Sequence, residues 1–548
     1  MDTQRLILFV IFSFSAFILW DRWQAEHRPP LPTSAPTAGK PSSDTPSAVP
    51  RATPAASAPN APPASAPNAP GASVPAPAKG EKIEIKTDRY VADVDTLGGV
   101  ITQVALTQHR DTDHPDNPYV LLQRNESRTF LAQSGLIGEG LPNHHTLWQA
   151  LPGPRELGPG MDKLELKLAA TTLAGATVTQ TLTFHRGSYV IDVSYEVTNT
   201  GAAPITPTAY FQLARDSKPT GIQSWGAPSA YTGFSNIDKG KAKFTDKTDN
   251  GWVGMVEHYF VAAWLPADAT KVSRDFYVNK VDNLYYAGVK IPVGSVAPGA
   301  TARVSVPLYV GPQEQDTLKS LAAGLDLVVD YGIFTVIAAP LFWLLKWLHS
   351  LLGNWGWAII AMTIIIKSAF YPLNHASARS MAKMKVVAPK MKALQEQYAN
   401  DKQQLQMKMM ELYKTEKINP LGGCLPIVVQ IPVFIALYWV LLAAVELRHA
   451  PWIGWIHDLS APDPYFVLPV VYAITAYLQV RLSPTPIQDP VQAKVMQIMP
   501  IAFSVLFLFF PSGLVLYWLI NNSLQIFQQW HMNRVIERET AAAAAKRR

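Results

Sequence analysis

Five apolar stretches in the second half of the chain constrain its fold more than any other feature of the sequence. They comprise residues 355–371, 424–445, 465–480, 495–510 and 514–529. Such stretches predict membrane-spanning helices, although several fall short of the roughly 20 residues that a bilayer core of about 30 Å requires. As a helix, residues 495–510 would reach only about 24 Å, so we expect the lipid to be thinner around them.

The N-terminus predicts one further span. Residues 6–20 are predominantly apolar and follow a single Arg5. A cleavable signal peptide is the alternative, but the stretch ends in Ile18, Leu19 and Trp20, where a cleavage site requires small residues. We therefore predict a first transmembrane helix at 1–22. Residues 23–80, rich in Pro, Ala and Ser, cannot bury a core and predict an extended linker.

Residues 81–317 predict a separate domain of β-strands. Short segments such as 82–86 and 177–184 alternate apolar and polar residues, and Gly, Pro and Asn punctuate them. Period-two alternation forms sheets with one buried face, so a large β-sandwich is the best fit. The paired His144 and His145 have no neighbouring Cys or carboxylate. We expect both to be surface loop residues.

The sequence holds no pattern typical of an enzyme or a metal site. It lacks a nucleophile elbow, a metalloprotease helix motif and a phosphate-binding glycine loop. Its single cysteine, Cys424, excludes an intrachain disulfide, and no Cys–His cluster has metal-ligand spacing. We expect a non-enzymatic protein without metal or cofactor.

Basic residues orient the predicted spans. Between residues 375 and 417 the chain has nine basic and four acidic side chains, whereas residues 446–463 have one Arg and three acids. By the positive-inside rule the first segment is cytoplasmic and the second lies outside, and the basic tail at 531–548 is cytoplasmic.

Residues 333–352 leave two interpretations open, because they are long enough to span but contain Pro340, Lys346 and His349. If they span, the β-domain lies inside; if 318–353 forms a flat, amphipathic interfacial helix, it lies outside. The flat helix agrees with the signal-like N-terminus. It predicts six transmembrane helices, both termini in the cytoplasm and a periplasmic β-domain. The remaining boundaries are 354–372 for the second transmembrane helix, 373–419 for a cytoplasmic helical hairpin and 420–530 for helices three to six.

Lys367 is the most informative single residue, because it lies inside the apolar stretch 355–371. A charge within a span is costly and by default indicates function. The alternative is that Lys367, four residues before Tyr371, extends its aliphatic stem to the lipid headgroups. Thr363 lies one helical turn earlier and shares its face.

Polar residues in the other spans point to the same region. In the last span Trp518, Asn522, Gln525 and Gln529 recur at helical spacing, and Gln430 and Gln497 add amides to two further spans. Together they could line a wet cavity open to the cytoplasm and closed to the outside. A purely structural hydrogen-bond network between helices is the alternative.

The segment 373–419 predicts two amphipathic helices, interrupted by Pro389 and by residues 400–401. Its basic side chains could contact anionic lipid or an acidic partner such as ribosomal RNA. Simple agreement with the positive-inside rule is the alternative. The candidate contact residues are Lys383, Lys385, Lys390 and Lys392.

Several motifs in the C-terminal half closely resemble the YidC family of membrane protein insertases. They are YPL at 371–373, SMAKM at 380–384, LYK at 412–414, EKINPLGGC at 416–424, WIHDLS at 455–460, DPY at 463–465 and FPSGLVLY at 510–517. The N-terminal anchor, linker and β-domain follow the Gram-negative architecture of that family, whose periplasmic domain is a supersandwich.

This resemblance implies an insertase of the bacterial inner membrane, acting alone or beside the Sec translocon. Its hydrophilic groove carries one basic residue that attracts the acidic or polar segment of an incoming protein. That residue is often Arg in the family, and the matching position here is Lys367, which keeps the charge but loses bidentate pairing. Thr363, Tyr517 and Trp518 match positions where the family touches its substrates. The implied partners are nascent membrane proteins, the ribosome, targeting factors and anionic phospholipids.

Two other functions remain to be compared. A small-molecule or lipid transporter would also place a basic residue in a polar cavity, but transporters usually show inverted repeats, and we find none. A membrane-anchored carbohydrate-binding protein would need only one span.

Overall fold

The computed structural model describes residues 80–111, 114–172, 175–218, 250–266, 272–329, 331, 334–398, 401–416, 425–482 and 504–547, with four short strands between 233 and 248. The predicted first transmembrane helix at 1–22, nearly all of the linker and residues 495–503 of another predicted span lie outside these ranges. The chain divides into a strand-rich unit before residue 330 and a helical unit after it. Each unit is described by itself.

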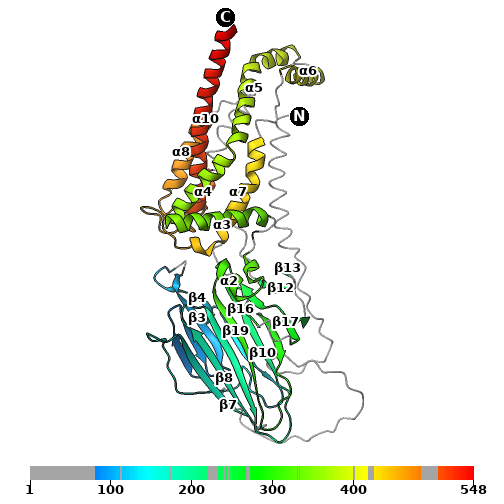
Figure 1. The fold of residues 1–548 in the computed structure, drawn as a ribbon, viewed down its shortest axis with the longest axis vertical. Helices are drawn as coiled ribbons and strands as arrows, with labels where there is room; N and C mark the ends of the chain where they lie inside the picture. Colours follow the sequence, from blue (N-terminus) through cyan, green and yellow to red (C-terminus); the bar gives the residue numbers. More distant parts are fainter. Residues whose placement is uncertain are drawn as a thin grey trace. The chain divides into compact units, whose positions relative to one another are not determined.

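Two large antiparallel sheets build the strand-rich unit (Figure 1). The first has the order β1 (Lys82–Lys86), β2 (Tyr90–Asp95), β3 (Val100–Arg110), β4 (Pro118–Arg124), β5 (Thr129–Ile137), β10 (Thr208–Asp216), β18 (Leu284–Pro292), β17 (Arg274–Val281) and β14 (Lys247–Thr248). The second has the order β11 (Gly233–Ser235), β15 (Val253–Val256), β16 (Phe260–Trp264), β19 (Thr301–Pro312), β9 (Val190–Asn199), β8 (Ala176–His185), β7 (Lys163–Thr171) and β6 (Gln149–Ala150). A small pair, β12 (Ile237–Asp238) and β13 (Lys241–Ala242), stands apart. The prediction of a sheet domain is confirmed.

Alternation along the strands explains why the two sheets pack on each other. In β8 every second residue is buried, including Val178, Leu182 and Phe184. The buried faces meet through large side chains, as where Phe211 of the first sheet contacts Trp264 of the second, with ring centroids 5.1 Å apart. Apolar residues at period two therefore place the core between the sheets.

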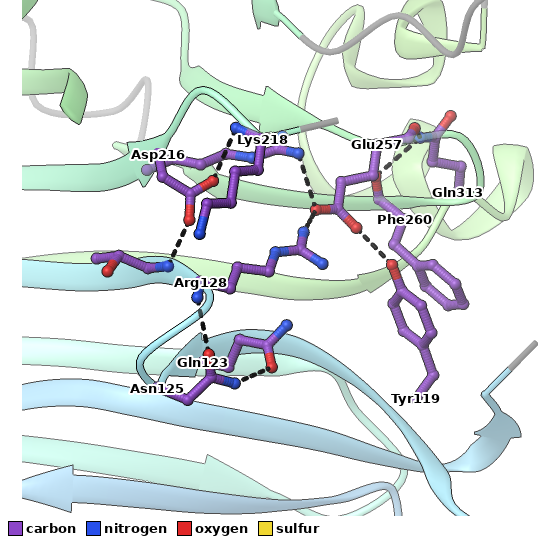
Figure 2. A network of polar contacts seen from close by, with 11 residues as sticks. Tyr119, Gln123, Asn125, Arg128, Asp216, Lys218, Glu257, Phe260 and Gln313 are labelled. Carbon is purple, nitrogen blue, oxygen red and sulfur yellow. Dashed lines mark hydrogen bonds and ion pairs between the residues drawn. The ribbon is translucent and has the colours of Figure 1, made fainter. Parts of the chain in front are cut away.

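A buried carboxylate joins the two sheets at one place (Figure 2). Glu257 lies between β15 and β16 and is 2% exposed. It accepts hydrogen bonds from Tyr119 of β4 at 2.5 Å and Arg128 at 2.5 Å, and it forms an ion pair with Arg215 of β10 at 3.2 Å. Gln313, directly after β19, donates to the Glu257 carbonyl at 2.6 Å. The Glu257 side chain thus fixes groups from three places in the sequence, and its backbone carbonyl fixes a fourth.

His144 corrects one expectation from the sequence. It is buried, with 5% of its surface exposed, and shares a hydrogen bond with the Tyr210 hydroxyl; only His145 is exposed. Burial, with a smaller effect of His145, lowers the pKa of His144 to about 3. The surface prediction was wrong for His144 because its partner lies 66 residues further along the chain.

A short helical segment follows the last strand. It consists of α2 (Gln315–Leu321) and the 3-10 turn η2 (Leu325–Val328). The predicted interfacial segment 318–353 therefore contains separate pieces, because its long helix, α3 (Thr335–Leu352), begins only in the helical unit.

The helical unit has one long central helix, α10 (Ser512–Arg547), which packs against α4 (Trp355–Ala369), α5 (Tyr371–Gln397), α7 (Leu425–Ala443) and α8 (Val467–Leu482). The unit is completed by α6 (Lys402–Thr415) and the 3-10 turns η5 (Val445–Leu447) and η6 (Phe507–Phe509).

Helix α3 runs across α4 and α7 and packs against both (Figure 1). One face, with Phe342 and Leu345, packs inward, whereas Trp343 and Trp347 are exposed on the other. Both faces are thus apolar or aromatic, as suits a helix in contact with lipid.

Length and composition test the six-span prediction only in part. Among the described residues, α3 is the one helix long and apolar enough to cross a membrane by itself. Helix α4 passes the same test only together with the start of α5, across a bend of 55°. The apolar parts of α7 and α8 are shorter. Six transmembrane helices therefore stay a prediction.

Candidate functional site

Helix α4 carries the residues singled out in the sequence on a buried face. Asn354 caps its start by accepting a hydrogen bond from the Trp357 backbone N–H at 3.2 Å. Thr363 is fully buried and donates to the Ile359 carbonyl at 2.7 Å, one turn back. Lys367, one turn further on, is 4% exposed. The i, i+4 spacing thus brings both side chains to one face, as predicted.

Lys367 contacts the polar face of α10. Its Nζ donates to Gln525 Oε1 at 2.9 Å. No ion pair joins Lys367 to a carboxylate within the described part of the chain. The ammonium is therefore held between helices by a neutral amide.

Three further polar contacts connect α10 to its neighbours. Gln430 of α7 donates to Asn521 at 2.9 Å, and Asn522 donates to Thr475 of α8 at 2.9 Å. The third contact joins α5 to α10, where Asn374 Nδ2 donates to Gln528 Oε1 at 3.3 Å. Polar side chains of α10 therefore reach α4, α5, α7 and α8.

Sequence reasoning found only part of this set. Gln430, Asn522 and Gln525 were predicted, whereas Asn521 and Gln528 were missed. A helical wheel could have found both, since each lies within about 80° of Trp518 at 100° per residue. The partners Thr475 and Asn374 give no signal of their own, because single polar residues in apolar helices are common.

Tyr517 and Trp518 lie near the start of α10. Tyr517 is 1% exposed. Trp518 packs between Phe434 of α7 and Phe507, with ring centroids 4.5 and 5.8 Å away. Its indole N–H is buried and makes no hydrogen bond with the described residues. The Trp518 N–H can therefore still donate a hydrogen bond, for example to a carbonyl group.

Two predicted residues do not belong to the α10 contacts with neighbouring helices. Gln497 lies outside the described residues. Gln529 instead donates to Asn533 within α10, at 2.9 Å.

A loop connects the starts of α8 and α10, at the end of these helices away from Lys367. Asp463, 1% exposed, accepts from the Leu468 backbone N–H at 2.7 Å near the start of α8 and from the Trp455 indole at 3.0 Å. The Ser512 backbone N–H donates to the Ala461 carbonyl at 2.7 Å at the start of α10. Lys367 lies about 18 Å further along α4 than its first residue. The contact between Lys367 and Gln525 is thus separated from this loop along the length of the helices.

The α5–α6 pair is held by an apolar contact. Val387 and Met391 of α5 pack with Met409, Leu412 and Tyr413 of α6.

Among the predicted hairpin residues, Lys390 is paired with Glu416 at 2.6 Å, and Lys392 lies 4.0 Å from Glu396. The side chains of Lys383 and Lys385 lie outside the described set.

Comparisons with known proteins cover both units of the chain. The family model described as "60Kd inner membrane protein" matches residues 347–539, and the one described as "YidC periplasmic domain" matches residues 82–344. A protein named membrane protein insertase YidC from Nitrosospira multiformis is 50% identical over 573 aligned residues, with 100% of both chains covered. Another from Aromatoleum aromaticum is 49% identical, covering 99% of this chain and 100% of its own. The chain belongs to the YidC family.

A solved structure of an active YidC insertase, with its first transmembrane domain resolved, is also similar to this chain. It shares 18% identity, covers 81% of this chain and 91% of its own, and has a TM-score of 0.39. The resemblance to the YidC family stated from the motifs is confirmed by the family models and relatives. YidC proteins are inner-membrane proteins and not enzymes.

Proposed function

We propose that this YidC protein inserts other proteins into the inner membrane, alone or together with the Sec translocon. Its working part is a hydrophilic groove on α10 and its neighbours that carries one positive charge. Lys367 attracts acidic or polar segments of the client. Thr363, Gln430, Tyr517, Trp518, Asn522 and Gln525, with Gln497, line the groove.

The observation that carries this proposal is that the Lys367 side chain is buried and that its bonded partner is neutral. A buried ammonium is costly unless charged or polar groups compensate it, and here the bonded partner is a single neutral amide. A lysine extended to the headgroups would be solvated at its tip, whereas Lys367 is bonded to Gln525 between two helices. An uncompensated positive charge at low dielectric attracts a carboxylate strongly.

The proposed topology follows the charges of the sequence. Residues 1–22, 354–372 and four helices within 420–530 span the membrane, and α3, part of the interfacial segment 318–353, lies flat. The sheet domain at 81–317 is periplasmic and is joined to the first span by the linker at 23–80. The hairpin at 373–419 and the tail at 531–548 are cytoplasmic.

The proposed partners meet the protein on its cytoplasmic side. Ribosomes and targeting factors deliver nascent membrane proteins near the hairpin, where Lys383, Lys385, Lys390 and Lys392 contact them or anionic phospholipids. Partition of the client's apolar segment into lipid supplies the driving force, so insertion needs no nucleotide.

The test compares Lys367→Ala with the parent protein on paired clients whose translocated tails differ only in Asp or Asn. We expect the substitution to impair insertion of the Asp tail about tenfold and of the Asn tail much less, because only the former gains a charge-assisted contact. Protease protection in vesicles measures both. Lys346→Ala in α3 is the matched control, since it removes an ammonium near the Phe342 ring, away from the polar face of α10.

The comparison of Asp and Asn tails distinguishes a role of Lys367 in binding the client from a role in placing helix α4 in the membrane. If Lys367→Ala and the parent insert the two tails in the same ratio, Lys367 is only an interfacial anchor and the proposed groove charge is refuted. A loss of both tails in the Lys346→Ala control as well would indicate a general defect of the membrane helices.

A further inference from the structure

The pair Lys367–Gln525 differs from the other polar contacts of α10. Gln430–Asn521, Asn522–Thr475 and Asn374–Gln528 each join two neutral groups. Among these four contacts of the described residues, the one with Gln525 joins an amide to a cation. A neutral pair needs no counter-charge, whereas an ammonium bonded to one amide still lacks one.

Both members of this pair have hydrogen-bond donors to spare. An ammonium has three N–H groups, and that of Lys367 uses one on Gln525 Oε1. The amide nitrogen of Gln525 makes no hydrogen bond within the described part of the chain, although it carries two N–H groups. Because Oε1 and Nε2 are bonded to the same carbon, Nε2 is separated from the ammonium nitrogen by no more than this hydrogen bond and the width of one amide group. Two N–H groups of the ammonium and two of the Gln525 amide are therefore not used on acceptors of the described residues.

We propose that Lys367 and Gln525 form one two-point site for a carboxylate of the client, with Gln525 as its positioning and specificity-determining residue. Gln525 Oε1 holds the ammonium in place, and Gln525 Nε2 donates to the second carboxylate oxygen. A lone lysine is a point charge, whereas arginine offers a planar fork that binds both oxygens. The amide of Gln525 supplies the second arm that lysine lacks. This inference rests on the proposed function of Lys367.

The neutrality of residue 525 is part of the argument. A glutamate there would form an internal ion pair with Lys367 and cancel its attraction for a client carboxylate. A leucine would remove both the acceptor that orients the ammonium and the second donor.

The test uses the full-length protein in vesicles with the Asp-tail and Asn-tail clients. We expect Gln525→Leu and Gln525→Glu each to lower insertion of the Asp tail about tenfold relative to the Asn tail, as for loss of a hydrogen bond to a charged group. In the double variant Lys367→Arg/Gln525→Leu, we expect the arginine fork to restore the parent's ratio of Asp-tail to Asn-tail insertion, called the Asp preference below. Gln528→Leu is the matched control, because it removes the same amide from a neutral pair on α10 and should affect both tails equally.

Two results overturn the inference in distinguishable ways. If Lys367→Ala abolishes the Asp preference but Gln525→Leu and Gln525→Glu keep it, the charge acts without Gln525. If Lys367→Ala itself keeps the Asp preference, the proposed groove charge fails and the two-point site fails with it. Should Gln525→Leu not accumulate in the membrane, Gln525→Met decides, because it keeps the side-chain length and removes the amide without adding a charge.

Discussion

Replacing Glu257 by Gln tests whether the buried carboxylate holds the two sheets together. The substitution keeps the shape of the side chain and removes its charge. Arg128 and Arg215, which have 17% and 6% of their side chains exposed, then lose their shared counter-charge. Burial lowers the pKa of Arg215, and the Glu257 carboxylate opposes that shift.

The expected loss is large because the partners remain buried. Breaking a buried ion pair by removing one member costs about 3–5 kcal/mol, since the remaining charge is uncompensated. For a domain of about 150–250 residues, 1 kcal/mol corresponds to about 2–4 °C in Tm. We therefore expect Glu257→Gln to lower the Tm of the sheet domain by about 6–20 °C.

The assay is thermal unfolding of residues 81–317, followed by near-ultraviolet circular dichroism. Glu196→Gln is the control, because Glu196 pairs with Arg303 between β9 and β19 with 43% and 70% of the side chains exposed. Exposed pairs contribute at most about 1 kcal/mol. Equal Tm values for the two variants would refute the assignment of Glu257 as a structural link between the sheets.

Two further predictions concern topology and pH. Reporters fused after Leu318 should be periplasmic and those near Asn400 or at the C-terminus cytoplasmic, as the charge counts require; an exported signal from the Asn400 fusion contradicts six spans. His144, whose pKa is lowered to about 3, stays neutral in the folded domain while the unfolded chain binds a proton below pH 6.5. Its contribution to stability is therefore complete above pH 6.5 and is lost as the pH falls towards 3. His144→Asn should reduce the slope of unfolding free energy against pH by about 1.4 kcal/mol per unit in urea titrations between pH 6 and 4, and an unchanged slope would contradict this.

Local periodicity explains what the sequence could predict. The alternation in residues 177–184 is a property of one strand, and it predicted the buried face of β8. The helical spacing of Trp518, Asn522 and Gln525 likewise predicted one polar face. Both patterns are read within a few turns or residues, so no knowledge of distant partners is needed.

Contacts between distant residues explain what the sequence could not predict. Glu257 meets Arg128 across 129 residues, and neither residue belongs to a recognisable motif. The pairing of Gln525 with Lys367, across 158 residues, depends on which helix faces α10. A helical wheel shows which residues share a face, but it does not show what lies opposite.

The lengths of the helices connect the fold to the proposed insertion step. Helix α4 has 15 residues, which correspond to about 22 Å. From Ser512 to Trp530, α10 extends about 28 Å, close to a bilayer core of about 30 Å. If α4 spans the membrane as proposed, the helix that carries Lys367 is shorter than the bilayer core, and mismatch of this sign thins the bilayer. A client tail that reaches Lys367 then has less hydrocarbon to cross while its charge is compensated. We infer that the short helix α4 and its buried ammonium lower the same barrier.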